Sequence, residues 1–253
     1  MFAKSPRAFF VTPNAFGNGH GDQTALRPVG TLLVSHDGMT FEPKPLPAPQ
    51  VLSTDMGPVY PTRGDLSVAT RADGRVYVYC LLQAPQYTVG NGLEVMWSDD
   101  DGATWAGQQT LTLAEASNNV ESDRPWLGIG LDGELALTYQ QVPSGIWMSL
   151  SHDGGQTWSA FNLAASNVER VNLGAHGHPV FDGDDVVFPA ASMYGYVTER
   201  IPVVSDSIPY EIRLYRTSDG LRFTSQLVAT VLGHDPAVFP QMAKLDDGRL
   251  VVA

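Results

Sequence analysis

Three arginines stand at comparable places in the chain, each just ahead of an apolar run. They are Arg63 in the segment PTRGD, Arg124 in DRPW and Arg170 in NVER. A guanidinium group is planar and donates two parallel hydrogen bonds to a carboxylate, so converging arginines suit an acidic ligand. We therefore predict that Arg63, Arg124 and Arg170 bind substrate. The alternative is that each braces a contact between structural elements, because structural ion pairs outnumber functional ones.

Histidine and tyrosine side chains supply further candidates. His176 and His178 flank one glycine, so in an extended segment both imidazoles point to the same side, and His20 or His234 would be needed to complete a metal site. Because this spacing fixes no third ligand, we expect ordinary loop histidines and no metal. We keep His178 and Tyr194 as substrate-binding candidates. The chain has no glycine-rich phosphate loop and no serine nucleophile elbow, and we expect no cofactor.

A repeated turn motif must position these residues. Two copies read Ser-x-Asp-x-Gly-x-Thr-Trp, at 98–105 and 151–158, and two shorter relatives lie at 35–41 and 217–223. Aspartate accepts hydrogen bonds from nearby backbone amides, glycine supplies a positive φ, and the closing aromatic ring requires burial against a neighbour. Repetition at this spacing is typical of a repeated supersecondary unit. The motif carboxylates, with His36 and His152 inside the motifs, are therefore predicted to be structural.

These motifs resemble the Asp boxes, or bacterial neuraminidase (BNR) repeats, of the sialidase superfamily of β-propellers. The resemblance covers nearly the whole chain and implies an all-β fold of four-stranded antiparallel blades. Asp-Gly hairpin turns support the same order of strands in each repeat. We predict one sialidase-like propeller domain over residues 1–253, incomplete at its C-terminus. Its blades are expected near 7–55, 63–115, 124–165 and 177–231, with a partial blade at 236–253 and the first strand of the first blade absent or only sketched.

Sialidases, as the resemblance implies, hold a substrate carboxylate with three arginines, protonate the leaving group with an aspartate and attack with a tyrosine activated by a glutamate. Asp22 resembles the acid by position. Glu121 and Glu169 are further catalytic candidates, although they head two similar segments and are equally explained as structural repeats. The family's nucleophilic tyrosine comes from a late blade, and Tyr194 is only a stand-in for it. The chain also lacks the family's Phe/Tyr-Arg-Ile-Pro pattern, which puts the activity in doubt.

Strand order predicts which face of a propeller carries function. In an up-and-down blade, the Asp-Gly turns and the Asp boxes lie at one end, and the longer loops lie at the other end. Long loops on a rigid scaffold are where function concentrates. The end opposite the Asp boxes is therefore the predicted binding face.

Composition limits the partners. The 253 residues carry 15 basic and 27 acidic side chains, a net charge of −12, which argues against a nucleic-acid partner. No apolar stretch reaches the roughly 20 residues of a membrane span. The first residues do not form a signal peptide, yet the family resemblance favours an extracellular or periplasmic protein. The single cysteine, Cys80, excludes an internal disulfide and lies in an apolar run that predicts burial.

Three functions remain open on the sequence. The first is a sialidase-like propeller that acts on a glycan or glycoconjugate, as an exo-glycoside hydrolase on sialic acid or a related sugar. The second is a non-catalytic lectin-like or protein-binding propeller, favoured by the missing arginine pattern. The third is a five-bladed glycosidase that uses a pair of carboxylates, which fits the acidic loops but not the boxes.

Overall fold

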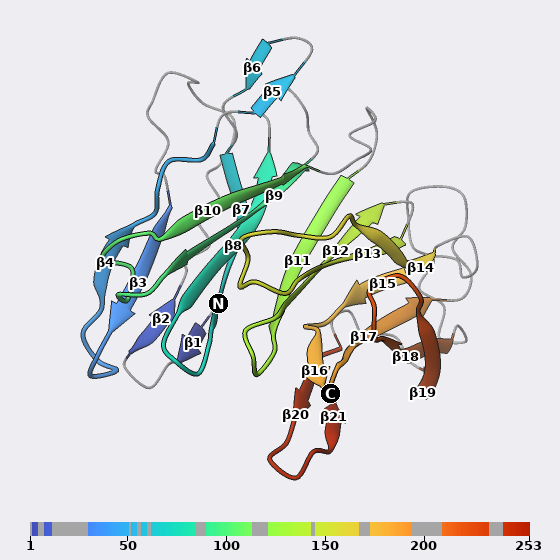
Figure 1. The fold of residues 1–253 in the computed structure, drawn as a ribbon. Helices are drawn as coiled ribbons and strands as arrows, with labels where there is room; N and C mark the ends of the chain where they lie inside the picture. The colour runs from blue at the N-terminus through green and yellow to red at the C-terminus, as the bar shows by residue number, and fades with distance from the viewer. Residues whose placement is uncertain are drawn as a thin grey trace. The chain divides into compact units, whose positions relative to one another are not determined.

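Figure 1 shows a chain built from β-strands. The computed structural model describes residues 2–4, 8–11, 30–50, 52–54, 57–59, 62–83, 90–112, 121–142, 145–166, 173–193, 209–232 and 240–253, and these residues form no helix. Within these ranges, no helix is long and apolar enough to cross a membrane. The chain divides into two compact units, Met1–Pro125 and Trp126–Ala253, each described by itself.

The first unit contains two four-stranded antiparallel sheets and a small hairpin. The strands are β1 (Phe2–Lys4), β2 (Phe9–Val11), β3 (Thr31–Ser35) and β4 (Glu42–Pro45) in one sheet, β5 (Leu52–Thr54) and β6 (Gly57–Val59) in the hairpin, and β7 (Thr62–Thr70), β8 (Val76–Gln83), β9 (Gly90–Ser98) and β10 (Gly107–Thr112) in the other sheet. In both sheets, strands that follow one another in the chain are hydrogen-bonded neighbours.

The second unit repeats this meander. Its strands are β11 (Glu121–Ile129, which begins in the first unit), β12 (Leu135–Val142), β13 (Gly145–Ser151) and β14 (Asn162–Ser166), then β15 (Leu173–His176), β16 (Val180–Asp182), β17 (Asp185–Met193), β18 (Pro209–Thr217) and β19 (Thr224–Leu232), and finally the hairpin of β20 (Met242–Lys244) and β21 (Leu250–Val252). Both β15 and β16 pair with β17, so two short strands together form the first strand of this sheet.

The predicted all-β architecture of four-stranded antiparallel sheets is confirmed, and two details differ. The first strand of the first blade was expected to be absent or only sketched, but β1 pairs with β2 from Phe2–Val11 to Lys4–Phe9. The β5–β6 hairpin, residues 52–59, lies at the boundary between the blades expected near 7–55 and 63–115. Three residues in each strand suffice for these pairings, and runs that short leave little alternation in the sequence.

The core of the first unit lies between its two sheets. Phe10 and Leu32 from the first sheet pack in one cluster with Val78, Cys80 and Met96 from the second, and all of these side chains are buried. Residues 76–82 of β8 are buried on both faces, which explains why that run is continuously apolar rather than alternating. The predicted burial of Cys80 is confirmed. Burial raises the pKa of its thiol, which disfavours the reactive thiolate.

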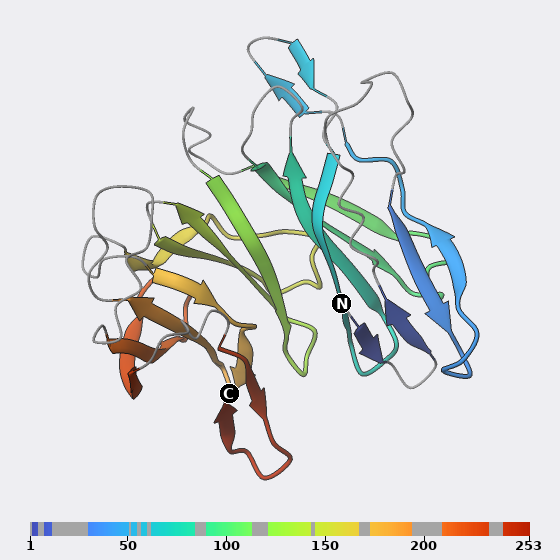
Figure 2. The ribbon, with the colours of Figure 1, turned by 180° about the vertical axis from the view of Figure 1, so that it is seen from behind.

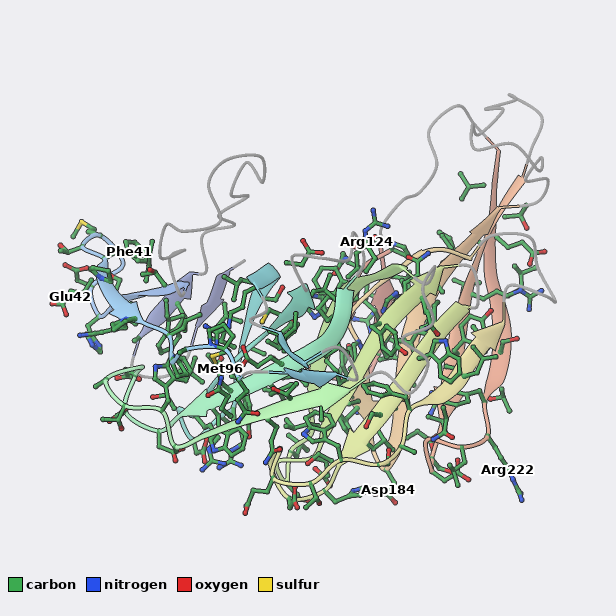
Figure 3. All side chains as sticks on the ribbon, turned by 90° about the horizontal axis from the view of Figure 1, so that it is seen from above. Phe41, Glu42, Met96, Arg124, Asp184 and Arg222 are labelled. Carbon is green, nitrogen blue, oxygen red and sulfur yellow. The ribbon has the colours of Figure 1, made fainter. Side chains whose placement is uncertain are left out.

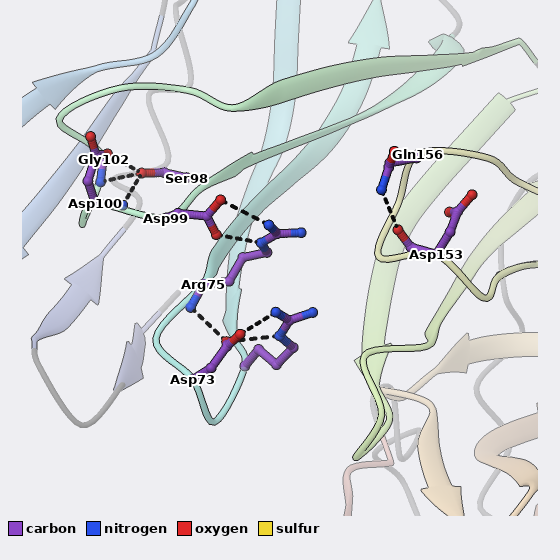
Figure 4. Close-up of polar contacts among 9 residues, drawn as sticks. Asp73, Arg75, Ser98, Asp99, Asp100, Gly102, Asp153 and Gln156 are labelled. Atoms are coloured by element: carbon purple, nitrogen blue, oxygen red, sulfur yellow. Dashed lines mark hydrogen bonds and ion pairs between the residues drawn. The ribbon is translucent and has the colours of Figure 1, made fainter.

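The four repeated motifs, called Asp turns from here on, are closed by their own side chains. In the turn at 98–105, Asp100 accepts hydrogen bonds from the Ser98 hydroxyl at 2.8 Å, the Thr104 amide at 2.8 Å and the Thr104 hydroxyl at 2.6 Å. The Ser98 hydroxyl in turn accepts from the Gly102 amide at 2.8 Å (Figure 4). Asp153 accepts the matching bonds from Ser151 and Thr157 in the turn at 151–158.

The Asp turns also fasten neighbouring sheets. The Trp105 indole donates a hydrogen bond to the Pro45 carbonyl at 3.0 Å, from the second sheet to the first. A Cβ added at Gly102 would lie 3.0 Å from Leu32, and one added at Gly220 would lie 2.8 Å from Leu150 on the preceding sheet. Both glycines have positive φ. Each therefore meets a conformational and a steric demand at the same position.

Within the first unit, the turns and the strand entries lie at opposite ends. Figures 1 and 2 show the β3–β4 and β7–β8 connections at the lower end and the β5–β6 hairpin at the upper end. The β3–β4 connection is an Asp turn; Figure 3 labels its last residue, Phe41, and Glu42, the first residue of β4. Strand β7 begins at the upper end, so residues near its start are remote from the β3–β4 Asp turn of the first unit.

Candidate functional site

A β-bulge near the start of β7 redirects one carboxyl group. Gly64 pairs with Leu81, but the next pair is Ser67 with Tyr79, so Asp65 and Leu66 together oppose Cys80. Leu66 is buried, whereas Asp65 is only partly buried and has φ 48°. Bulges commonly re-aim a side chain next to a functional site, and the left-handed conformation is rare for a residue other than glycine.

The start of β11 holds a second unusual residue. Arg124 has φ 54°, and its Nε lies 3.3 Å from Oδ2 of Asp123. The two side chains are 35% and 37% exposed, and Arg124 is labelled in Figure 3. Among the described residues, the non-glycine positions with positive φ are Asp65, Asp101 and Arg124. Two of these three belong to the strand entries, and backbone strain of this kind gathers at functional sites.

The two strand entries meet through their acidic groups. Asp65 is hydrogen-bonded to the Asp123 side chain and to the backbone amide of Arg124. Burial raises the pKa of Asp65, the neighbouring Asp123 raises it further, and the charge of Arg124 opposes the rise. We name Asp65, Asp123 and Arg124 the carboxyl cluster. All three residues lie in the first unit.

The carboxyl cluster combines two acidic side chains with one guanidinium group. Two carboxyl groups in one hydrogen bond share a proton, because both cannot ionise at close range without strong repulsion. Arg124 forms an ion pair with Asp123, which offsets negative charge on this pair. Such a pair can exchange a proton with a ligand and can also accept hydrogen bonds from hydroxyl groups of a ligand.

Arg63 lies deeper, in a buried ion pair. Its Nε is 2.5 Å from Oε2 of Glu94, and its Nη1 donates to the Pro47 carbonyl at 2.7 Å. The Arg63 and Glu94 side chains are 3% and 0% exposed. Gln108 donates to the other Glu94 oxygen at 2.5 Å and to the Ala48 carbonyl at 2.9 Å. This network joins the second sheet to the 46–50 connection, as the bracing alternative requires.

The two histidines lie in the second unit and pack against strand β11. Nε2 of His176 is 3.1 Å from Oγ1 of Thr138, and the His176 carbonyl accepts a hydrogen bond from the Trp126 indole at 2.8 Å. The His178 ring centroid lies 4.1 Å from that of Trp126. Burial lowers the pKa of His178 to about 4, so this imidazole is neutral at physiological pH. Within the described ranges, no group of three or more His, Cys, Asp or Glu side chains is arranged to hold a metal ion.

The fold is shared with solved structures although the sequence is remote from known families. No family model matches the chain, and no curated protein matches it. A protein of unknown function from Dyadobacter fermentans matches with a TM-score of 0.58 and 17% identity, over 99% of this chain and 72% of that one. An α-L-arabinofuranosidase from Fusarium graminearum matches with a TM-score of 0.54 and 14% identity, over 97% and 71%.

A third neighbour is an exo-β-1,3-galactanase from Clostridium thermocellum, with a TM-score of 0.55 and 9% identity, over 99% of this chain and 53% of that one. Identities this low establish the fold alone. The predicted propeller fold of four-stranded antiparallel blades is thus confirmed, and it is the fold of glycosidase-type propellers.

The described residues include only some of the predicted site residues. Arg63, Arg124 and His178 are described above, and the substrate-binding roles assigned to them stay predictions. Of Glu121, only the backbone at the start of β11 is described. The other candidates lie outside the described residues, and their roles also stay predictions: Asp22, Glu169, Arg170 and Tyr194.

Sequence reasoning missed Asp65 and Asp123 as site residues. Each lies within two positions of an arginine that was singled out, Arg63 or Arg124. An acidic residue at the entry of two successive blades was therefore a usable signal. The bulge and the positive φ values that bring the two carboxyl groups together leave no comparable trace in the residue types.

Proposed function

We propose that this protein is a glycan-acting propeller that hydrolyses a glycosidic bond at the carboxyl cluster. The hydrogen bond between Asp65 and Asp123 carries the proposal, because a partly buried carboxyl group with a raised pKa beside a second carboxyl group suits acid–base chemistry. The fold supports it, since the similar structures include an arabinofuranosidase and a galactanase. Asp65 lies near the start of β7, at the end remote from the β3–β4 Asp turn of the first unit, and this position also fits a binding face.

Hydrolysis needs two catalytic groups, one on each side of the scissile bond. One group protonates the leaving oxygen, and a carboxylate on the other side activates water or attacks the sugar, with about 5 to 9.5 Å between them. Asp65 and Asp123 are hydrogen-bonded to each other, so both act on the same side of the scissile bond. The carboxyl cluster donates or accepts the proton on that side, and Arg124 orients Asp123. Asp22, Glu121 and Glu169 stay the catalytic candidates that the sequence predicts.

The finer proposal, a sialidase with Asp boxes acting on sialic acid, rests on the sequence resemblance. The four Asp turns support it through their internal hydrogen bonds. The second candidate function is a lectin-like module that binds a glycan without cleaving it. The close contact of Asp65 and Asp123 favours this candidate. Carboxyl groups on one side of a sugar can bind its hydroxyl groups, whereas hydrolysis also needs a group on the other side.

The test is hydrolysis of a panel of nitrophenyl glycosides and a methylumbelliferyl sialoside. We expect Asp65→Asn and Asp123→Asn each to lower kcat/KM at least about 100-fold, the usual contribution of a general acid or base. Asp73→Asn is the matched control, because Asp73 is an exposed aspartate on the β7–β8 turn, paired with Arg71.

The outcomes separate the candidate functions. A folded wild-type protein that cleaves no substrate but binds immobilised glycans, with binding weakened by Asp123→Asn, is the lectin-like module. A protein that neither cleaves nor binds a glycan contradicts the proposal. Equal loss of activity in Asp73→Asn and Asp65→Asn would show that the effect lies in the stability of the fold.

A further inference from the structure

We propose that the carboxyl cluster takes an uncharged sugar and discriminates against sialosides and uronides. This inference rests on the proposed function and names the class of its substrate. It departs from the sequence expectation of an acidic ligand, and the positions of the arginines and acidic groups in the structure are the reason.

The described arginines are already engaged by acidic partners. Eight arginines lie within the described ranges, and seven of them form an ion pair: Arg63 with Glu94, Arg71 with Asp73, Arg75 with Asp99, Arg124 with Asp123, Arg213 with Glu211, Arg216 with Asp182 and Asp185, and Arg249 with Asp247. The eighth, Arg222, belongs to the Asp turn at 217–223, and its amide donates to Asp219. A high arginine content therefore balances acidic side chains and does not by itself indicate an anion site.

Arg63 is withdrawn from the surface. Its side chain is 3% exposed, and its Nε and Nη1 already donate to Glu94 and Pro47. Presenting this guanidinium to a ligand would require breaking the ion pair and leaving the Glu94 charge buried at 0% exposure. An uncompensated buried charge is strongly unfavourable, so the pair stays closed when a ligand arrives.

The Arg124 side chain is about one-third exposed, and its charge interacts with two acidic neighbours. Its Nε pairs with Asp123, and its charge also acts on Asp65. A substrate carboxylate at this position would compete with Asp123 for the guanidinium and would bring a third acidic group to a single positive charge. Like charges at close range disfavour such binding, and the net charge of −12 adds to the repulsion.

Hydroxyl groups match the cluster without this penalty. A sugar hydroxyl donates a hydrogen bond to a carboxylate and accepts one from a guanidinium, so neighbouring hydroxyls can satisfy Asp123 and Arg124 together. In its protonated form, the Asp65 carboxyl group can also donate to a sugar oxygen. No charge is added in either contact. A neutral pentose or hexose ring is thus the class of ligand that these three side chains fit.

The decisive experiment compares substrates that differ by one carboxylate. The α and β anomers of nitrophenyl glucoside and glucuronide, and of nitrophenyl galactoside and galacturonide, form such pairs, and the sialoside is assayed beside them. We expect kcat/KM for the preferred neutral glycoside to exceed that for its uronide at least about tenfold. Asp123→Asn removes one negative charge and should reduce this ratio at least about threefold, whereas Asp73→Asn should leave it unchanged.

The outcomes distinguish the inference from the proposed function. Cleavage of the sialoside or a uronide as fast as the neutral substrates overturns the inference and leaves the glycan-acting function in place. A ratio that is the same in wild type, Asp123→Asn and Asp73→Asn also overturns it, because the selectivity then arises elsewhere. If the folded protein neither cleaves these substrates nor binds the neutral sugars in calorimetry, the proposed function fails and the inference fails with it.

Discussion

Aspartates occupy two opposite environments in this protein. In the Asp turns, the carboxylate is surrounded by donors, and the hydrogen bonds from Thr157 and Ser151 lower the pKa of Asp153 to about 2. Hydrogen bonds lower the pKa of Asp100 and Asp219 in the same way. In the carboxyl cluster, Asp65 is partly buried and faces another acidic group, so its pKa is raised. The pKa of the same residue type is therefore lowered in the Asp turns and raised in the carboxyl cluster.

The difference shows what separates a structural carboxylate from a reactive one. The donors of the Asp turn at 98–105 lie within four positions of Asp100, so its hydrogen bonds are local in the sequence. The neighbour of Asp65 is more than fifty positions away, and a bulge is needed to reach it. Local chemistry thus builds the scaffold, and tertiary contacts build the candidate site.

The largest expected effect concerns Glu94, a buried carboxylate that accepts hydrogen bonds from several donors. Glu94 accepts hydrogen bonds from Arg63 and Gln108 at 0% side-chain exposure. Glu94→Ala leaves the Arg63 guanidinium buried without its counter-charge and should lower the free energy of unfolding by about 3–5 kcal/mol. Urea unfolding followed by tryptophan fluorescence measures the change.

Glu94→Gln is the matched control for this prediction. The amide keeps the shape and an oxygen that accepts from Arg63, so its loss of stability should be smaller than that of Glu94→Ala. If both variants unfold within about 1 kcal/mol of wild type, the Arg63–Glu94 pair does not brace the sheet and Arg63 is available for another role.

The next effect tests the Asp turns as fasteners between sheets. Gly220 has φ 69°, and an added Cβ would lie 2.8 Å from Leu150. Gly220→Ala should therefore cost about 2–4 kcal/mol, the sum of a left-handed alanine and an overpacked contact. Gly248 has φ 84° with nothing within 4 Å of the added Cβ, so Gly248→Ala should cost only about 1–2 kcal/mol. Equal costs in denaturant unfolding would show that the turn does not press on the neighbouring sheet.

The same division explains what the sequence could predict. Ser98, Asp100, Gly102 and Thr104 hold their turn through bonds within four positions, so residue types and spacing were enough to predict it. The alternation and Asp-Gly turns of the hairpins are equally local, and the four-stranded sheets followed from them.

The site was less accessible to sequence reasoning because its geometry is not local. The residue types around Arg63 do not reveal its partner Glu94, which lies 31 positions away, or its burial, which depends on the packing of the first two sheets. Asp65 and Asp123 carried no distinguishing neighbours except those arginines. Their contact depends on the bulge in β7 and on the left-handed conformations of Asp65 and Arg124, which residue types do not specify.

The smallest expected effect separates the two kinds of aspartate by the sign of their pH dependence. Because the pKa of Asp65 is raised on folding, the folded state binds more protons between about pH 4 and that pKa, and stability falls as pH rises through this window. The side-chain amide introduced by Asp65→Asn would donate to Asp123 as the protonated acid does, so the variant should gain stability over wild type as pH rises. Asp153→Asn should lose stability at neutral pH, with a deficit that closes as pH falls from about 4 towards 2. Urea unfolding from pH 3 to 8 measures both differences, and an Asp65→Asn curve parallel to wild type would mean that the two carboxyl groups do not share a proton.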